Sequence, residues 1–305
     1  MLRREFLTAV GATTAVAGVQ PLLPAVQPHG EASHIATNTY PWSTFARRND
    51  ESLELHSDAL LQDIASTGIM GYEPIIQKTE EFEGLGERLK KHGLEMRSLY
   101  VNSTLHEAAQ ADASIQEVLA IAKEARKIGT SIIVTNPSPI RWGGPEDKND
   151  AQLTCQAKAM DELGTELKKL GVTLAYHNHD AELRQGGREF HHMLTATNQE
   201  NVKLCLDSHW VFRGCGDSQV ALFDAVTHYI DRIVELHLRQ SESGVWTEAF
   251  SMQGDIDYRR LFHLLDEKQI KPHYVLEQSI EAKSPQDMTV VVAHQAGRVN
   301  LAKVL

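Results

Sequence analysis

Short apolar runs alternate with longer amphipathic stretches along most of the chain, and this alternation constrains the fold more than any other feature. We count eight pairs over about 270 residues, each an expected strand followed by an expected helix. The expected strands are 34–40, 71–76, 95–101, 131–135, 172–176, 202–207, 232–238 and 273–277. Repeated strand–helix units of this size form a parallel sheet, and eight of them favour a closed barrel. The sequence therefore predicts an α/β protein with a (β/α)8 TIM barrel.

An open, doubly wound sheet is the competing arrangement. Such sheets usually carry a glycine-rich turn after the first strand, and this chain has none. It also lacks a GxxxxGK[ST] phosphate loop. The 305 residues suffice for one barrel, which typically needs about 250. We expect residues 32–305 to form that barrel, with residues 1–31 as a separate N-terminal segment.

The N-terminal segment resembles a twin-arginine export signal. Arg3 and Arg4 precede Phe6 and Leu7, and a small, weakly apolar run follows at 9–19. The alternative is a short helix with a chance arginine pair. The apolar run is shorter than the roughly 20 residues of a membrane span. We therefore expect export by the twin-arginine route, a periplasmic location, and no membrane span in the mature protein.

The acidic composition narrows the classes of partner. A formal net charge of -11 argues against a nucleic-acid surface, which needs a basic stripe. It is compatible with a small-molecule carbohydrate or a cation, and the sequence leaves room for a homo-oligomer. The three cysteines show no paired spacing and are expected to be free thiols.

Metal-binding residue types end the last four expected strands. His177, Asp207, His237 and Glu277 each follow an apolar run. Since the chemistry of a TIM barrel lies at the carboxyl ends of its strands, these side chains should converge. Mixed nitrogen and oxygen ligands suit Mn, Co, Zn or Fe better than Mg or Ca. The pattern predicts one divalent metal, and the alternative is a set of rim residues with buried hydrogen bonds.

Two further residues are candidates for proton transfer. Side chains alternate along a strand, so His179 should point the same way as His177, as a fifth ligand, a partner or a base. Glu73 ends the second expected strand. It is either a substrate acid or base, an extra ligand, or a salt-bridged carboxylate at the rim.

Together these motifs resemble the xylose isomerase-like barrels known as sugar phosphate isomerases/epimerases. The resemblance covers about residues 32–305. It rests on the stretches 176–182 (YHNHDAE), 206–210 (LDSHW), 235–239 (ELHLR), 254–258 (GDIDY) and 275–277 (VLE). In that family one divalent metal is held at the ends of strands five to eight, usually by Glu, Asp, His and Glu. Asp207, His237 and Glu277 match by position, and His177 stands where the epimerases have Glu.

The resemblance implies proton abstraction beside the carbonyl of a keto sugar or polyol. Glu277, His177 or His179 would be the base, and Glu73 or the other histidine a general acid. Loss of the glutamate at strand five weakens a two-base epimerisation and resembles the family's lyases, such as inosose dehydratases and 3-keto-glycoside lyases. The sequence predicts a sugar isomerase or epimerase, with a keto-sugar lyase or dehydratase as the alternative. A non-catalytic exported carbohydrate-binding barrel is the alternative from another class.

Four residues are expected to contact the substrate. Arg239 lies two residues after His237, and Trp142 lies in the loop after the fourth strand. His209 follows the sixth strand, and Glu182 either reaches the pocket or caps a loop. Tryptophan is also ordinary core material. We expect a non-phosphorylated substrate, because no phosphate cradle is visible in the last loops and export leads away from sugar phosphates.

Overall fold

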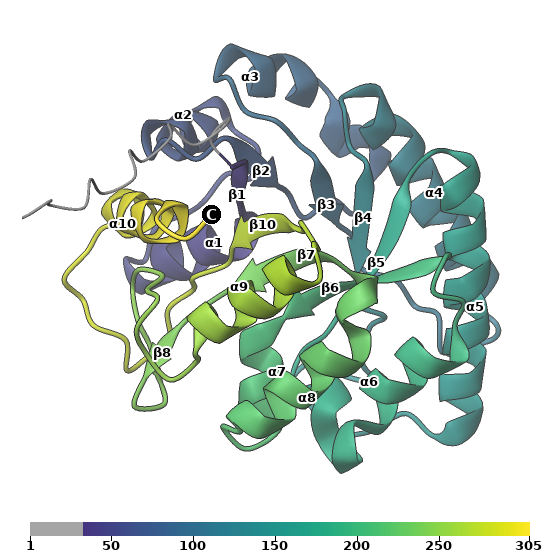
Figure 1. Cartoon of the computed structure of the whole chain (residues 1–305). Helices are drawn as coiled ribbons and strands as arrows, with labels where there is room; N and C mark the ends of the chain where they lie inside the picture. The colour runs from purple at the N-terminus through teal and green to yellow at the C-terminus, as the bar shows by residue number, and fades with distance from the viewer. Residues whose placement is uncertain (1–32) are drawn as a thin grey trace, which may run out of the picture. The chain divides into compact units, whose positions relative to one another are not determined.

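The computed structural model describes residues 33–305, which form a barrel of eight parallel strands surrounded by helices (Figure 1). The strands are β1 (Ile35–Asn38), β2 (Gly71–Glu73), β3 (Ser98–Tyr100), β4 (Ile132–Thr135), β5 (Thr173–His177), β6 (Val202–Asp207), β7 (Ile233–Leu238) and β10 (His273–Leu276). They pair in the order β2-β1-β10-β7-β6-β5-β4-β3. Isolated parallel bridges at Gly71–Glu95 and Ile75–Tyr100 join the two ends of this sheet. The predicted TIM barrel is confirmed.

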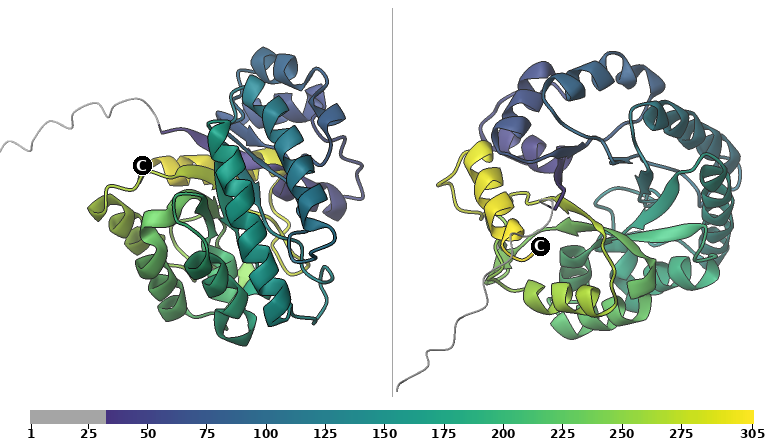
Figure 2. Two further views of the ribbon diagram at one scale, coloured as in Figure 1. Left: turned by 90° about the vertical axis from the view of Figure 1, so that its right-hand side faces the viewer. Right: turned by 45° about the horizontal axis from the view of Figure 1, so that its top comes forward.

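The helices form a ring outside the strands, as the right-hand view of Figure 2 shows. They are α1 (Thr39–Arg48), α2 (Asp58–Ser66), α3 (Leu85–Lys91), α4 (Ala111–Lys127), α5 (Asp150–Lys169), α6 (Arg184–Ala196), α7 (Ser208–Gly214), α8 (Gln219–Tyr229), α9 (Tyr258–Glu267) and α10 (Val290–Ala302). Short 3₁₀ helices lie at η1 (Thr79–Phe82), η2 (Ala181–Leu183) and η3 (Ile230–Arg232). The hydrophobic core lies between this ring and the outer face of the barrel.

Local capping residues determine where several helices begin. The side chain of Asn149 accepts a hydrogen bond from the backbone N–H of Gln152, and the side chain of Gln152 accepts one from the backbone N–H of Asn149. This reciprocal pair starts α5 directly after the long loop 136–148. Ser57 caps α2 with a single hydrogen bond, in which its hydroxyl accepts from the backbone N–H of Leu60 at 3.2 Å.

Several elements differ from the expected ones. The first strand is shorter than the expected 34–40, because Asn38 ends β1 and caps α1 by accepting a hydrogen bond from the backbone N–H of Tyr40. The stretch 79–92 between β2 and β3 forms two helices, η1 and α3, because Gly84 between them adopts a left-handed backbone with φ of 63°. Helix α7 begins directly at the end of β6, and a small hairpin, β8 (Ser241–Glu242) and β9 (Val245–Trp246), lies in the loop after β7.

The inside of the barrel is unusually polar. Such interiors are normally filled by bulky branched residues. Here a small apolar cluster of Val134, Ala175 and Cys205 lies beside the buried carboxylates of Glu73 and Glu235. Charged side chains inside a barrel need partners, so this region is organised by polar contacts rather than by apolar packing alone.

Residues 1–32, including Arg3 and Arg4, lie outside the described part of the chain. Within residues 33–305 no helix combines the length and apolar character required to cross a membrane.

Candidate metal centre and pocket

The structure brings the four expected metal ligands together. His177 ends β5, Asp207 ends β6, His237 lies in β7, and Glu277 directly follows β10. All four are buried, and one ligand atom from each lies within 4.8 Å of those of the other three. Asp207 and His237 are direct partners in the parallel register of β6 and β7. Closure of the barrel thus assembles residues that are up to 100 positions apart in sequence.

His237 is surrounded by carboxylates. Its Nδ1 lies 2.7 Å from Oε2 of Glu277, and its Nε2 lies 3.0 Å from Oε1 of Glu73 and 3.3 Å from Oε1 of Glu235. Burial opposes the charged imidazolium, but neighbouring Cys205, Glu73 and Glu277 outweigh it and raise the pKa of His237 well above its usual range. Burial likewise opposes ionisation of Glu277, yet His237 and Arg239 hold the pKa of that carboxyl below its ordinary value.

Of the two carboxylate oxygens of Asp207, one accepts a hydrogen bond and the other has no hydrogen-bond partner among the described residues. Its Oδ1 accepts from the backbone of Trp210 at 2.8 Å and so caps α7. Its Oδ2 is buried and lies 3.7 Å from the nearest guanidinium nitrogen of Arg239. Burial raises the pKa of Asp207 to about 7, although the charge of Arg239 opposes this. A buried carboxylate oxygen within a two-nitrogen, two-oxygen donor set fits a divalent transition metal.

The two histidines at the end of β5 lie side by side, as their alternation predicts. Their ring centroids are 4.8 Å apart. Burial lowers the pKa of His179 to about 4 and that of His177 well below its usual range, so both are neutral near pH 7. Nδ1 of His179 is buried without a partner among residues 33–305. Asn178 points away and ties β5 to β6 through the backbone of Asp207, at 3.1 and 3.2 Å.

A cavity of about 550 Å³ opens above the candidate ligands. Five of the residues singled out from the sequence line it: Trp142, His177, His179, Glu182 and Glu277. Two aromatic side chains that the sequence did not indicate, Tyr40 and Tyr100, also line it, together with Trp210 of the 206–210 stretch. Its size and its aromatic walls with a few polar groups are typical of small-molecule sites.

Trp142 and Glu182 shape the cavity in different ways. Trp142 is 56% exposed and its ring meets that of His179 edge-on, with centroids 5.5 Å apart. Glu182 is almost fully buried and accepts the backbone N–H of His179 at 2.6 Å. Both alternatives considered for Glu182 therefore hold, because it lines the cavity and also fixes the loop that carries His179.

Of the three roles considered for Glu73, its position fits the paired carboxylate, with Nε2 of His237 at 3.0 Å. It is fully buried beneath His237, accepts a hydrogen bond from the hydroxyl of Ser98 at 2.7 Å, and does not line the cavity. Burial, followed by the charge of Glu235, raises the pKa of Glu73 to about 8. A side chain behind a candidate ligand cannot reach the substrate, so the expected acid or base role of Glu73 is replaced by a contact with His237.

His209 and Arg239 also lie outside the cavity lining. His209 is fully buried and its Nε2 pairs with the hydroxyl of Ser241 at 2.9 Å, so it does not contact a substrate in the cavity. Arg239 is fully buried, donates from Nε to the backbone of Glu277 at 3.0 Å, and stacks 4.3 Å from the ring centroid of Trp246. It lies beside the candidate ligands rather than in the open pocket.

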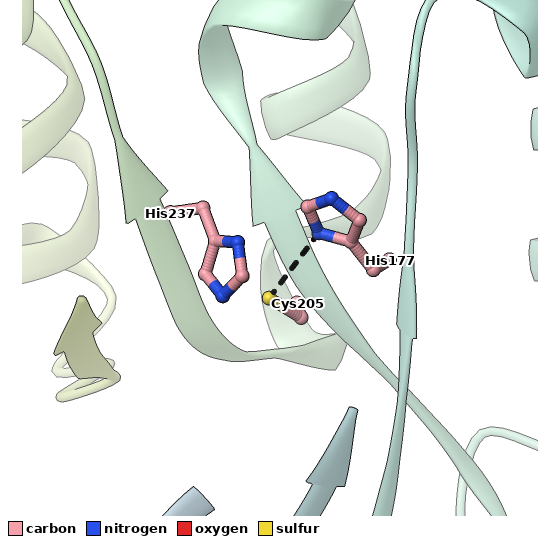
Figure 3. A group of neighbouring side chains, drawn as sticks. All are labelled: His177, Cys205 and His237. Carbon is pink, nitrogen blue, oxygen red and sulfur yellow. Dashed lines mark hydrogen bonds between the residues drawn. The ribbon is translucent and has the colours of Figure 1, made fainter. Parts of the chain in front are cut away.

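Sequence reasoning missed three residues in the barrel interior. Cys205 comes two residues before Asp207, Glu235 two residues before His237, and His273 begins β10. The alternation of side chains along a strand could have identified the first two, because residues two apart share a face. Cys205 lies between His177 and His237 in Figure 3. Burial raises the pKa of its thiol well above the usual range, so the thiol is protonated near pH 7.

Several known proteins resemble this chain in sequence or in fold. The sequence model of the xylose isomerase-like TIM barrel family matches residues 61–293. An inosose dehydratase from Clostridium botulinum is 21% identical over 245 residues, which cover 71% of this chain and 80% of that protein.

Three solved structures share the fold. A sugar phosphate isomerase/epimerase from Parabacteroides distasonis has a TM-score of 0.69 and 16% identity, over 92% of this chain and 98% of that one. The 3-keto-D-glucoside 4-epimerase from E. coli has a TM-score of 0.64 and 14% identity, over 89% and 98%. A xylose isomerase-like barrel protein from Mycobacterium smegmatis, in complex with magnesium, has a TM-score of 0.66 and 13% identity, over 90% and 97%.

Proposed function

Because this chain belongs to the xylose isomerase-like TIM barrel family, we propose that it is a divalent-metal-dependent enzyme that isomerises or epimerises a non-phosphorylated keto sugar or polyol. The convergence of His177, Asp207, His237 and Glu277 below the cavity carries this proposal. Both the similarity to sugar epimerases and the aromatic lining of the cavity support a carbohydrate ligand.

The four buried residues would hold the metal. When bound, a divalent ion supplies Lewis acidity that polarises a carbonyl oxygen and stabilises negative charge on it. The magnesium complex of a similar barrel supports a divalent ion in general. The histidine pair in this donor set favours Mn, Co, Zn or Fe over Mg.

With His177 assigned to the metal, the candidate bases that line the cavity are His179 and Glu277. His179 is neutral, and its unpartnered Nδ1 can accept a proton from the carbon next to a carbonyl. Glu277 is ionised, but His237 and Arg239 both hold it, which makes it the weaker proton acceptor. We therefore assign the first proton transfer to His179.

Return of the proton to the opposite face of that carbon would complete an epimerisation, and its return to the neighbouring carbon would complete an isomerisation. Loss of a leaving group from the carbon beyond it would instead give a lyase or dehydratase. The histidine at strand five and the similarity to an inosose dehydratase favour this second candidate. In that reaction the leaving hydroxyl or glycosidic oxygen departs with a proton from a general acid.

One experiment separates these reactions. The metal-loaded protein is incubated in deuterated water with keto sugars, including a 3-keto-glucoside. An isomerase or epimerase returns a rearranged sugar that carries deuterium, whereas a lyase releases the aglycone and an unsaturated keto sugar. Tight sugar binding without turnover, in a protein that holds no metal, would contradict both and leave a carbohydrate-binding barrel.

A further inference from the structure

A row of buried polar side chains lies deeper in the barrel than the candidate metal ligands. Its members Cys205 and Glu235 come two residues before Asp207 and His237 on the same strands. Glu235 is the central member of this row. In the parallel register it pairs with Cys205 of β6 on one side and with His273 of β10 on the other. Cys205 in turn pairs with His177 of β5. The row thus runs from a candidate ligand, His177, to the carboxylate of Glu235 through a single thiol.

The hydrogen bond between Cys205 and Glu235 has a defined direction. Glu235 accepts from the thiol of Cys205 at 3.3 Å through Oε1 and contacts Nδ1 of His273 at 2.9 Å through Oε2. An ionised carboxylate only accepts hydrogen bonds, so the proton of the thiol is directed to Glu235. Because the single hydrogen of the thiol is directed to Glu235, the sulfur of Cys205 can act only as an acceptor toward its other neighbours.

That other side faces His177. Nδ1 of His177 lies 3.6 Å from Sγ of Cys205, the contact drawn as a dashed line in Figure 3. Because the sulfur acts as an acceptor there, Nδ1 must carry the hydrogen of the neutral imidazole. Nε2 of His177 is then left with its lone pair, as a metal ligand requires.

We infer that Glu235 and Cys205 are positioning residues, which fix the tautomer and ring orientation of His177 through the chain Glu235–Cys205–His177. This inference rests on the proposed metal centre. It addresses the end of β5, where the family resemblance implies a Glu and this chain carries His177. A carboxylate can ligate through either oxygen, whereas a histidine ligates only through the nitrogen that carries no hydrogen. A histidine at this position therefore requires neighbours that keep the hydrogen on Nδ1, and Cys205 and Glu235 fulfil this requirement.

The test compares three variants with matched controls. Cys205→Ala breaks the chain, Cys205→Ser keeps a group that both donates and accepts, and Glu235→Gln replaces a pure acceptor with an amide that also donates. Cys155→Ala removes a half-buried thiol in α5, and Glu248→Gln alters a buried carboxylate that pairs with Arg48, both outside the row. Zinc affinity is measured by competition with a chelating indicator.

We expect Cys205→Ala and Glu235→Gln to weaken zinc binding roughly 10- to 100-fold, the range for loss of outer-shell partners. Cys205→Ser should recover most of the affinity, and both controls should match the wild type. Unchanged zinc affinity in Cys205→Ala and Glu235→Gln would overturn the inference. So would equal losses in Cys205→Ala and Cys205→Ser, because packing alone would then explain them.

A second readout does not depend on metal. Nitrogen-15 NMR of histidine-labelled, metal-free protein should show His177 as the tautomer with hydrogen on Nδ1, and Cys205→Ala should change this population. The opposite tautomer in the wild type would overturn the inference even if zinc binds. If the wild type binds no divalent metal, the proposed function fails, while the NMR result still decides the roles of Cys205 and Glu235. If Glu235→Gln does not fold, the two Cys205 variants decide the question.

Discussion

Nδ1 of His237 and Oε2 of Glu277 lie 2.7 Å apart, although 40 residues of sequence separate them. Both are buried, and β7 and β10 are neighbours in the barrel. A carboxylate and an imidazole held this closely, with Asp207 and His177 beside them, present four ligand atoms to one point. This relationship leads directly to the first prediction.

Asp207→Asn and His237→Asn should each remove the metal. Asparagine at 207 can keep the cap of α7 through Oδ1 but loses the charge that a cation needs. Loss of a direct ligand should weaken metal binding at least as much as the roughly 10- to 100-fold typical of outer-shell changes. Metal content is measured by mass spectrometry on protein that unfolds like the wild type. Full metal in both variants, at the level of the Glu248→Gln control, would contradict the site.

Trp142→Ala should raise KM with little change in stability. Trp142 lines the cavity but is largely exposed, so its removal creates no buried void. An aromatic contact of about 1 kcal/mol corresponds to a roughly fivefold increase in KM. Ile140→Ala is the control, because Ile140 is an exposed apolar residue of the same loop that does not line the cavity. Equal effects of the two changes would remove Trp142 from the substrate site.

Lys148→Met should destabilise the protein strongly. Nζ of Lys148 is buried and lies 2.6 Å from Oε1 of Glu189, which tethers the end of loop 136–148 to α6. Removing one partner of a buried pair costs about 3–5 kcal/mol, because the other charge remains without compensation. The double variant Lys148→Met, Glu189→Met should recover most of this loss. Urea unfolding of the wild type, the two single variants Lys148→Met and Glu189→Met, and the double variant measures the coupling. If the losses of the single variants simply add in the double variant, the pair is not coupled.

His294 should make stability fall in mild acid. It is buried between the hydroxyl of Thr37, at 3.0 Å, and the backbone of Val290, at 2.8 Å. Burial lowers its pKa to about 4. The unfolded chain, with a histidine pKa near 6.5, binds a proton between pH 6.5 and 4 that the native state does not. The free energy of unfolding should therefore decrease as the pH is lowered from 6.5 to 4, by up to about 1.4 kcal/mol per pH unit from this group.

The measurement is urea unfolding of the wild type and His294→Gln at pH 7.5 and 4.5. The wild type should lose roughly 2 kcal/mol more than the variant over this interval. Equal losses would show that His294 does not contribute. The comparison isolates His294, since the other buried histidines are the same in both proteins.

Export is predicted to depend on the arginine pair. Arg3 and Arg4 precede a short apolar run, and the twin-arginine route exports folded proteins that can already hold a metal. Replacement of both by Lys should keep the charge but leave the protein in the cytoplasm. Cell fractionation measures this, with a Lys78→Arg variant as a control for a distant change of cationic residue. Unchanged export of the double variant would exclude the twin-arginine route.

The alternation of strand and helix patterns determined the barrel, because each apolar run can be buried only in a parallel sheet covered by helices. The same pattern placed His177, Asp207, His237 and Glu277 at strand ends, and the barrel's geometry then required them to meet. Local signals were less complete. The helix α7 begins at the strand end itself, where Asp207 serves both as candidate ligand and as cap, and this double use had no separate signature.

Depth within the barrel is what only the tertiary structure decided. A strand end can lead into the cavity or remain below it, and this depends on the tilt and stagger of each strand against its neighbours. Glu73 therefore lies beneath His237 although it ends β2, and Glu182 reaches the cavity from the 3₁₀ helix η2. The row of Cys205, Glu235 and His273 likewise arises from register between strands far apart in sequence. A single sequence shows which residues of one strand lie on the same face. Their partners on other strands are determined only when the sheet closes into a barrel.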